Sequence, residues 1–285
     1  MSVTQSIKRP LVVLTGPTAV GKTKLSIALA KAIGGEILSA DSMQVYKHMD
    51  IGSAKIRPEE MQGVPHHLID ILEPWEEFNV VVFQKRCLES MEQIYDRGHI
   101  PILVGGTGFY IQAVLRGIDF TENEENTEYR EKMEQLAKEK GPEVLHEMLR
   151  KIDPVSAENI HANNIKRTIR ALEYYHQTGE KISEHNESQR QKNSPYDFIY
   201  YVLRLPREIL YDRINRRVDL MREQGLEAEV RRLREQGCTR NMVSMQGLGY
   251  KEILAALDGE CTMDEAFDKI KLETRHFAKR QFTWF

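Results

Sequence analysis

The stretch LVVLTGPTAVGKT, from Leu11 to Thr23, decides the fold that this sequence predicts. The apolar run Leu11–Leu14 is typical of a short buried strand. Gly16 and the group Gly21–Thr23 then follow the P-loop spacing G-x-x-x-x-G-K-[ST], in which backbone N–H groups and a helix N-terminus surround phosphate oxygens. A helix is predicted next, because apolar residues recur at helical spacing: Leu25, Ala28, Leu29 and Ala32.

Within this loop, the Lys22 side chain is expected to reach over bound phosphates, and the Thr23 hydroxyl can bind Mg²⁺. The alternative is a glycine turn with an incidental lysine, which the strand before the loop and the helix after it disfavour. We expect the whole loop to bind a nucleotide or a diphosphate: Gly16, Pro17, Thr18, Ala19, Val20, Gly21, Lys22 and Thr23.

The composition is that of an ordinary globular protein. At 285 residues the chain can bury the core of a large α/β domain with an insertion. Its formal net charge of −3 gives no general attraction to nucleic acid, so any such binding must come from local basic patches. The cysteines lie far apart without metal-ligand spacing, and no apolar run approaches the roughly 20 residues of a membrane span. We therefore expect a cytoplasmic protein that does not enter a membrane.

Two further strand ends are expected to lie near the P-loop if the sheet is parallel. The strand Glu36–Ala40 runs into Asp41, and an acid at the carboxyl end of such a strand lies where open α/β sheets bind ligands. A carboxylate there can serve as a general base, although Asp-Ser also commonly caps a helix or a turn. The strand Ile100–Val104 ends in Gly105–Gly108, whose Thr107 offers a hydroxyl at the start of the next helix.

The remaining strands are predicted at Leu68–Leu72 and Phe198–Leu205. The adjacent histidines His66 and His67, before the first of these strands, would point to opposite faces of a strand and so could not easily hold one metal together. We interpret them as structural or substrate-shaping, and the structural interpretation is favoured. Pro206 opens a predicted helix on which Arg213 and Arg217 are four residues apart. That spacing suits a pyrophosphate and equally a solvated basic face.

From residue 121 to residue 190 the sequence predicts helices only. The stretch begins with an acidic run and continues with apolar residues at helical spacing. The predicted fold is therefore α/β, with a P-loop NTPase-like parallel sheet flanked by helices. Residues 1–120 and 191–285 would form this catalytic core, and residues 121–190 an all-helical insertion domain.

Basic residues cluster at three places. Lys166, Arg167 and Arg170 crowd one side of a predicted helix without interleaved acids, which favours a phosphodiester contact, although charge clusters are usually solvated faces. The loop Gln246–Lys251 carries an aromatic ring and a cation. The final helix interleaves basic residues with aromatic ones, a combination that suits a nucleic-acid backbone.

Three classes of function are compatible with these residues. The first is a small-molecule or nucleotide kinase, with Asp41 accepting the proton of an acceptor hydroxyl. The second is a transferase whose loop holds the diphosphate of an activated alkyl donor and whose acceptor is a nucleic acid. The third is an ATP-driven or non-catalytic nucleic-acid-binding module, which the lack of further ATPase motifs disfavours. Glycines after Ile100–Val104, where a Walker-B acid would stand, weaken the kinase interpretation.

Beyond these arguments, the chain resembles the bacterial tRNA dimethylallyltransferases, also called tRNA isopentenyltransferases, over nearly its whole length. Seven motifs match the family in its order: GPTAVGKT at Gly16–Thr23, DSMQVY at Asp41–Tyr46, PHHLID at Pro65–Asp70, VGGTGFY at Val104–Tyr110, KRTIRALE at Lys166–Glu173, GLGYKE at Gly247–Glu252 and AKRQFTWF at Ala278–Phe285. The resemblance implies transfer of a dimethylallyl group from its diphosphate to the exocyclic amine of the adenosine immediately 3′ of the anticodon.

The resemblance also implies roles for single residues. The P-loop, with Thr18, Lys22 and Thr23, would hold the donor's pyrophosphate together with Mg²⁺. Asp41 would take the amine proton, and Thr107 would hydrogen-bond in the reaction channel. Arg217, in the motif RRVDLM, matches a family arginine that stabilises the pyrophosphate, whereas Arg213 is added on spacing alone. The catalytic set is thus Lys22, Asp41, Thr107 and Arg217.

The expected partners are dimethylallyl diphosphate and the anticodon stem-loop of tRNA, with the protein acting as a monomer. The residues expected to contact the RNA are Asp41, Ser42, Met43, Gln44, Thr107, Lys166, Arg167, Arg170, Gln246, Gly249, Tyr250, Lys251, Lys279, Arg280 and Gln281. Family members usually continue beyond the TWF-type end, so a chain that stops at Phe285 is expected to be truncated or to lack a terminal element. The zinc finger of eukaryotic relatives is not found in the sequence, which leaves RNA binding to the insertion and the final helix.

Overall fold

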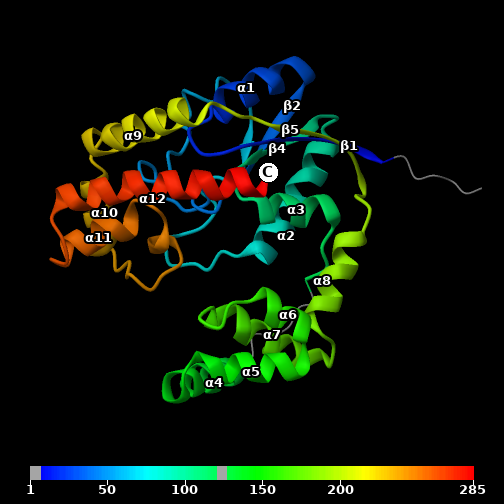
Figure 1. Ribbon diagram of the computed structural model, residues 1–285. Helices are drawn as coiled ribbons and strands as arrows, with labels where there is room; N and C mark the ends of the chain where they lie inside the picture. The colour runs from blue at the N-terminus through cyan, green and yellow to red at the C-terminus, as the bar shows by residue number, and fades with distance from the viewer. Residues whose placement is uncertain (1–7, 121–126) are drawn as a thin grey trace, which may run out of the picture. The chain divides into compact units, whose positions relative to one another are not determined.

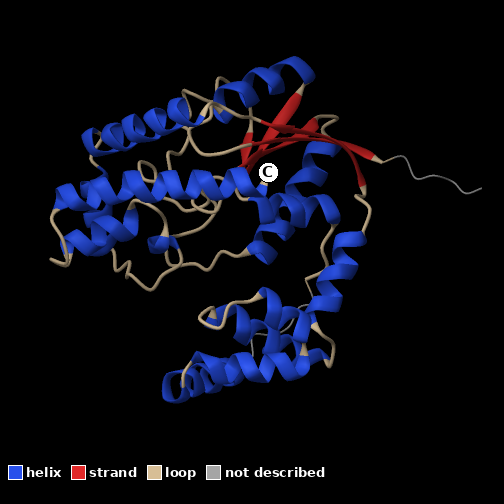
Figure 2. Cartoon of the chain, in the orientation of Figure 1, coloured by secondary structure: helices blue, strands red, loops and turns tan. Residues whose placement is uncertain are grey.

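The computed structural model describes residues 8–120 and 127–285, which form two compact units. The first unit contains the described residues up to Leu115 together with Pro195–Phe285, and the second is Arg116–Ser194. The strands belong to the first unit, and the described part of the second contains helices and loops only (Figure 2). Among the described residues, no helix combines the length and the apolar character needed to cross a membrane.

The first unit is built on a parallel five-stranded sheet with the order β3-β2-β4-β1-β5. Its strands are β1 (Arg9–Thr15), β2 (Gly35–Ala40), β3 (His66–His67), β4 (Ile100–Gly105) and β5 (Tyr196–Val202). Because β4 lies between β1 and β2, Gly105 is in register with Thr15 on one side and Ala40 on the other. The carboxyl ends of these three strands therefore meet at the edge where open α/β sheets bind ligands.

Helices cover both faces of this sheet (Figure 1). α1 (Lys22–Ile33) packs on one face, and α2 (Val80–Asp96) and α3 (Gly108–Arg116) pack on the other. The rest of the unit consists of α9 (Arg207–Glu223), α10 (Leu226–Glu235), η1 (Ser244–Gln246), α11 (Tyr250–Leu257) and α12 (Met263–Trp284). The last turn of α12 lies beside β4 and α3 (Figure 1).

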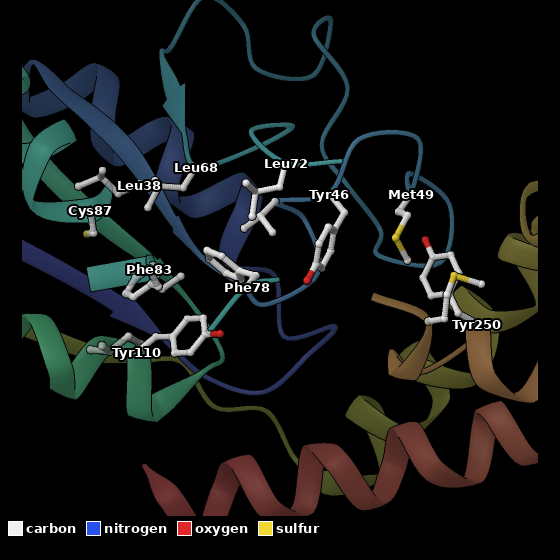
Figure 3. Close-up of a cluster of buried hydrophobic side chains, with 14 of the residues drawn as sticks. Leu38, Tyr46, Met49, Leu68, Leu72, Phe78, Phe83, Cys87, Tyr110 and Tyr250 are labelled. Atoms are coloured by element: carbon white, nitrogen blue, oxygen red, sulfur yellow. The ribbon is translucent and has the colours of Figure 1, made fainter. Parts of the chain in front are cut away.

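Alternation along β1 explains why the sheet needs helices on both faces. Leu11 and Val13 point into the core shared with α2 and α3, whereas Val12 points into the core shared with α1. Aromatic rings fill the first of these cores (Figure 3): the Phe83 ring stacks on the Tyr110 ring with centroids 4.5 Å apart. The apolar interior thus extends up to the strand ends, where the polar residues begin.

The second unit has a core of its own. It comprises α4 (Thr127–Lys140), α5 (Pro142–Ile152), α6 (Pro154–Asn159), α7 (Ile165–Thr178) and α8 (Ile182–Gln191). Leu149 and Leu172 are at most 1% exposed in this core. Burial raises the pKa of Asp153, but hydrogen bonds from Ser156 and Ser183 outweigh burial and lower this pKa below its ordinary value. These bonds tie the start of α6 to the start of α8.

The predicted stripe of α1 was wrong. Its buried residues are Ser26, Ile27 and Ala30, whereas Leu25 is 44% exposed. Apolar side chains occur on several faces of this helix, so helical spacing alone could not select the face that packs on the sheet.

Other boundaries also differ from the sequence prediction. The third strand is His66–His67 rather than Leu68–Leu72, because positive φ values at Leu68 and Asp70, +64° and +54°, interrupt an extended chain. The last strand ends at Val202, before the predicted end at Leu205, and it is an edge strand paired to β1. Pro206 is the residue before α9 rather than its first residue.

Candidate active site

The P-loop joins β1 to α1 in a backbone conformation that few side chains permit. Gly16 and Gly21 have φ values of +140° and +105°, and Ala19 has +63°. A Cβ atom on Gly16 would lie 2.6 Å from the Leu203 carbonyl oxygen. α1 begins at Lys22, and no side chain of the described residues caps its first turn. The N–H groups of that turn are therefore available to bind an anion.

Lys22 lies inside this loop, where Nζ donates to the carbonyl oxygens of Gly16 and Pro17 at 2.8 Å each. Burial lowers the pKa of Lys22 to about 8; the Asp41 carboxylate opposes this shift, and the Arg217 guanidinium adds to it. Lys22, Asp41 and Arg217 are thus close enough to interact electrostatically. A diphosphate would compensate the two partly desolvated cations.

Two arginines of α9 reach the loop. Arg217 Nη1 donates to Thr18 Oγ1 at 3.3 Å. Burial lowers the pKa of Arg217, and the Asp41 carboxylate opposes this shift. Arg213, one turn earlier, has Nη1 3.9 Å from the position that a Cβ atom would take on Gly21. The structure therefore places both arginine side chains at the P-loop.

The Asp41 carboxylate directly follows β2 and is held by the turn after it. Its Oδ1 accepts from the backbone N–H groups of Met43 at 2.8 Å and Gln44 at 3.4 Å. Among the described residues, no hydrogen bond to Oδ2 is formed. Asp41 thus combines both interpretations of the sequence, because it caps a turn and also interacts with the charges of Lys22 and Arg217.

The glycine turn after β4 lies between the P-loop and Asp41. Thr15 Oγ1, at the end of β1, donates to the Gly105 carbonyl oxygen at 2.8 Å, and the Thr107 N–H donates to the Ala40 carbonyl oxygen at 3.3 Å. A Cβ atom on Gly105 would overlap the backbone of Ala40. Glycine is therefore required for the strand ends to meet, and Thr107 stands partly exposed beside them.

The turn Ser42–Gln44 is partly exposed next to the carboxylate. The Gln44 side-chain oxygen accepts from the Ser39 hydroxyl at 3.0 Å. The Met43 side chain packs so closely on Gly247 that a Cβ atom there would overlap it. The loop before α11 therefore lies against a turn whose residues are expected to contact the RNA.

Tyr250 does not lie where the sequence prediction placed it. Its side chain is 0% exposed and lies near Met49 in the interior (Figure 3). Its hydroxyl donates to Glu229 Oε1 at 2.8 Å, and burial raises its pKa well above the ordinary value. The structure therefore corrects the expectation that Tyr250 contacts RNA, because its ring and its hydroxyl are both used within the fold.

Gly249 and Gln281 require the same correction. Gly249 is buried, and its N–H donates to Glu252 Oε2 at 2.8 Å, which starts α11. Gln281 is 6% exposed, and both polar groups of its amide bond to the backbone. Of the residues predicted around them, Gln246, Lys279 and Arg280 are exposed and Lys251 is partly exposed.

The basic cluster of the second unit lies on α7. Lys166, Arg167 and Arg170 are exposed there, and Asn164 begins the helix by accepting from the Arg167 N–H at 3.4 Å. Their contact with RNA stays a prediction.

One buried carboxylate was missed by the sequence interpretation. Glu229 is 1% exposed; its Oε2 accepts from the N–H groups of Asp50 and Ile51 at 3.0 and 2.8 Å, and its Oε1 accepts from the Gly52 N–H at 3.2 Å. The signal was present, because this acid lies on the apolar stripe of α10: Leu226, Val230 and Leu233.

Both adjacent histidines bond within the fold, and His66 does so through Nδ1, which lies 2.8 Å from the Val64 carbonyl oxygen. His67 Nε2 lies 2.6 Å from Glu36 Oε2, and His99 and Arg97 also bond to Glu36, at the start of β2. The Arg97 guanidinium is the main reason that the pKa of Glu36 falls to about 2. Among the described residues, no group of three or more His, Cys, Asp or Glu side chains could hold a metal ion.

A parallel sheet whose first strand leads into a phosphate-binding loop and a helix defines a P-loop NTPase-like protein. Two family models match this chain: IPP transferase over residues 44–285 and isopentenyl transferase over residues 10–71. The chain belongs to the IPP transferase family.

Relatives with assigned names support this membership. The chain is 63% identical over 277 residues to a tRNA dimethylallyltransferase of Lachnoclostridium phytofermentans, covering 97% of this chain and 88% of the relative. It is 54% identical to a protein of the same name from Carboxydothermus hydrogenoformans, covering 96% and 88%.

Solved structures of similar proteins also support membership of this family. The tRNA isopentenylpyrophosphate transferase of Bacillus halodurans is 47% identical, with a TM-score of 0.71 and coverage of 98% of this chain and 87% of that chain. A eukaryotic dimethylallyltransferase acting on tRNA is 33% identical, with a TM-score of 0.85 and coverage of 97% and 69%.

Proposed function

We propose that this protein transfers a dimethylallyl group from dimethylallyl diphosphate to the exocyclic amine of the adenosine immediately 3′ of the anticodon in tRNA, releasing diphosphate. The observation that carries the proposal is the electrostatic grouping of Lys22, Arg217 and Asp41 at the P-loop. Two cations suit a departing diphosphate, and a carboxylate beside them suits an acceptor that must lose a proton.

In the proposed reaction, the cations bind the leaving diphosphate and the carboxylate serves the acceptor amine. An adenine amine is a poor nucleophile, so the reaction depends on stabilising the diphosphate as it leaves and the allylic cation character that develops. Lys22, Arg217 and the N–H groups at the start of α1 bind the diphosphate, with Arg213 and Thr18 beside them. Asp41 takes the amine proton as the new C–N bond forms, and Thr107 orients the base from the neighbouring turn.

Mg²⁺ fits this site through few protein ligands. The exposed Thr23 hydroxyl stands at the P-loop position that holds Mg²⁺ in related loops, and the described residues provide no carboxylate cluster. The diphosphate oxygens and water would complete the coordination shell, as Mg²⁺ commonly prefers. A bound Mg²⁺ ion would neutralise part of the negative charge of the diphosphate.

The target base must leave the anticodon stack to reach Asp41. We propose that the exposed and partly exposed residues Ser42, Met43, Gln44, Gln246, Lys251, Lys279 and Arg280, with Lys166, Arg167 and Arg170 of the second unit, bind the anticodon stem-loop. The protein would act as a monomer in the cytoplasm. The kinase alternative is disfavoured, because β4 ends in glycines rather than an acid and the matching family models describe isopentenyl transferases rather than phosphotransferases.

The test is nucleoside analysis of unmodified tRNA after incubation with the protein, Mg²⁺ and labelled dimethylallyl diphosphate. We expect label on the adenosine 3′ of the anticodon. No transfer, together with ATP-dependent phosphorylation of a small acceptor, would instead support the kinase interpretation.

Asp41→Asn should lower the turnover number by about 10²–10⁴-fold, the usual effect of removing a general base, with little change in tRNA affinity. The matched control is Asp212→Asn, which changes an exposed carboxylate paired with Arg216 on α9. Loss of tRNA binding with intact single-turnover chemistry would show that Asp41 has a different role.

A further inference from the structure

The Gln281 side chain connects the two glycine turns of the site. Its Oε1 accepts from the Thr18 backbone N–H at 2.9 Å, and its Nε2 donates to the Gly106 carbonyl oxygen at 2.9 Å. Thr18 belongs to the P-loop, and Gly106 precedes Thr107 in the turn after β4. One buried amide from α12 therefore spans the gap between the loop that would hold the donor and the turn that faces the acceptor.

The fit is tight on both sides of this amide. A Cβ atom on Gly106 would overlap Gln281 Nε2, so this position accepts only glycine while the amide stays in place. The same Cβ position lies 3.5 Å from the Gly16 carbonyl oxygen, which shows how closely the two turns approach. The helix itself is anchored from α9, where Asn215 Oδ1 accepts from Arg275 Nη1 at 2.6 Å.

We propose that Gln281 is a positioning residue for the transfer: it sets the separation between the P-loop and the turn of Thr107, and it does not contact the RNA. The inference rests on the proposed function. Its physical basis is that the P-loop contains Ala19 at a positive φ and does not hold its geometry by local preference alone. An external hydrogen bond to Thr18 restrains the loop before the diphosphate binds.

The chemistry of the amide explains why a substitution should be informative. Glutamate has the same shape and can still accept from the Thr18 N–H, but it cannot donate to the Gly106 carbonyl oxygen, and its charge would face that oxygen. Asparagine has both groups but is one methylene shorter, so it cannot reach both partners at once. Alanine removes both bonds and opens a gap.

The experiment compares Gln281→Glu, Gln281→Ala and Gly106→Ala with the wild-type protein. The control is Gln236→Glu, an exposed amide at the end of α10 that undergoes the same chemical change. The turnover number, the KM for the donor, the Kd for tRNA and the unfolding midpoint are measured for each. Gln281→Glu should lower turnover about 10–100-fold, the effect of replacing one buried bond by a repulsion, with tRNA Kd within about twofold of wild type.

A double-substitution cycle separates positioning from general damage. Because Gly106→Ala displaces the same amide from its other side, the double variant Gly106→Ala/Gln281→Ala should be no slower than the slower single variant. Additive losses would overturn the proposal. A rise in tRNA Kd at unchanged turnover would also overturn it, because it would make Gln281 an RNA contact.

Two measurements do not require dimethylallyl transfer. They therefore test the positioning role of Gln281 separately from the proposed function. Hydrogen exchange at the Thr18 N–H should accelerate about tenfold or more in Gln281→Ala, because its acceptor is gone. Binding of inorganic diphosphate should weaken about three- to tenfold in the same variant, because the loop is less restrained. If both stay at wild-type values, Gln281 does not position the loop, whatever the wild-type protein transfers.

Discussion

The buried carboxylate of Glu229 permits a prediction with a magnitude. Its two oxygens accept four hydrogen bonds, three from the backbone N–H groups of Asp50–Gly52 and one from the Tyr250 hydroxyl. In Glu229→Gln the single amide oxygen can replace only one carboxylate oxygen. Whichever way the amide turns, at least one backbone N–H loses its acceptor, because the Tyr250 hydroxyl can turn to accept from an N–H₂ group but a backbone N–H cannot.

An unsatisfied buried donor costs about 1–3 kcal/mol, and the remaining bonds lose the contribution of the negative charge, so the free energy of unfolding should fall by about 3 kcal/mol. That loss corresponds to a fall of about 1 M in the urea midpoint of the first unit. The segment 50–52 should also open locally, because its backbone donors are the groups affected. We therefore expect faster hydrogen exchange at Asp50–Gly52 than at amides of the sheet.

The assay is urea unfolding followed by circular dichroism, together with site-resolved hydrogen exchange. The control is Glu227→Gln, two residues earlier on α10, where the carboxylate is 40% exposed and pairs with Arg231. That substitution should change stability by less than about 0.5 kcal/mol. An unchanged urea midpoint and unchanged exchange at Asp50–Gly52 in Glu229→Gln would refute the reasoning.

Two further predictions concern single charges. The pKa of Glu36 in the folded protein is about 2 against an ordinary 4.5, mainly because of the hydrogen bond from Arg97. The ionised carboxylate therefore stabilises the folded state by roughly 3 kcal/mol above about pH 4.5, and this contribution is lost as the pH falls toward 2. Acid unfolding of Glu36→Gln should therefore show a shallower pH dependence in that window than wild type, and equal slopes would contradict the prediction. Lys279→Ala should weaken tRNA binding and reduce the slope of log affinity against log salt by about 1, because the exposed cation would contact one phosphate. Titrations over a range of salt concentrations measure this slope, and an unchanged slope would remove Lys279 from the phosphate contacts.

Local features of the sequence predicted the P-loop and the carboxylate beside it. A P-loop is a contiguous pattern, so the residues Gly16 to Thr23 can be recognised from the sequence alone. A strand that runs into Asp41 places that carboxylate at the edge of a parallel sheet where ligands bind. The spacing of Arg213 and Arg217 suited a pyrophosphate and equally a solvated basic face, and only the fold brought both side chains to the loop. The P-loop and the place of Asp41 were predictable because each depends on residues close together in the chain.

Tertiary structure decided what the sequence pattern left open. The bond from Thr18 to Gln281 joins residues 263 positions apart, and the one from Tyr250 to Glu229 joins two helices through buried polar atoms. Gln281 and Tyr250 both occur in motifs expected to contact RNA. No spacing rule distinguishes a polar side chain that faces solvent from one that turns inward. The difference depends on which partners the folded chain brings within hydrogen-bond distance, because a buried polar group is tolerated only where such a partner exists.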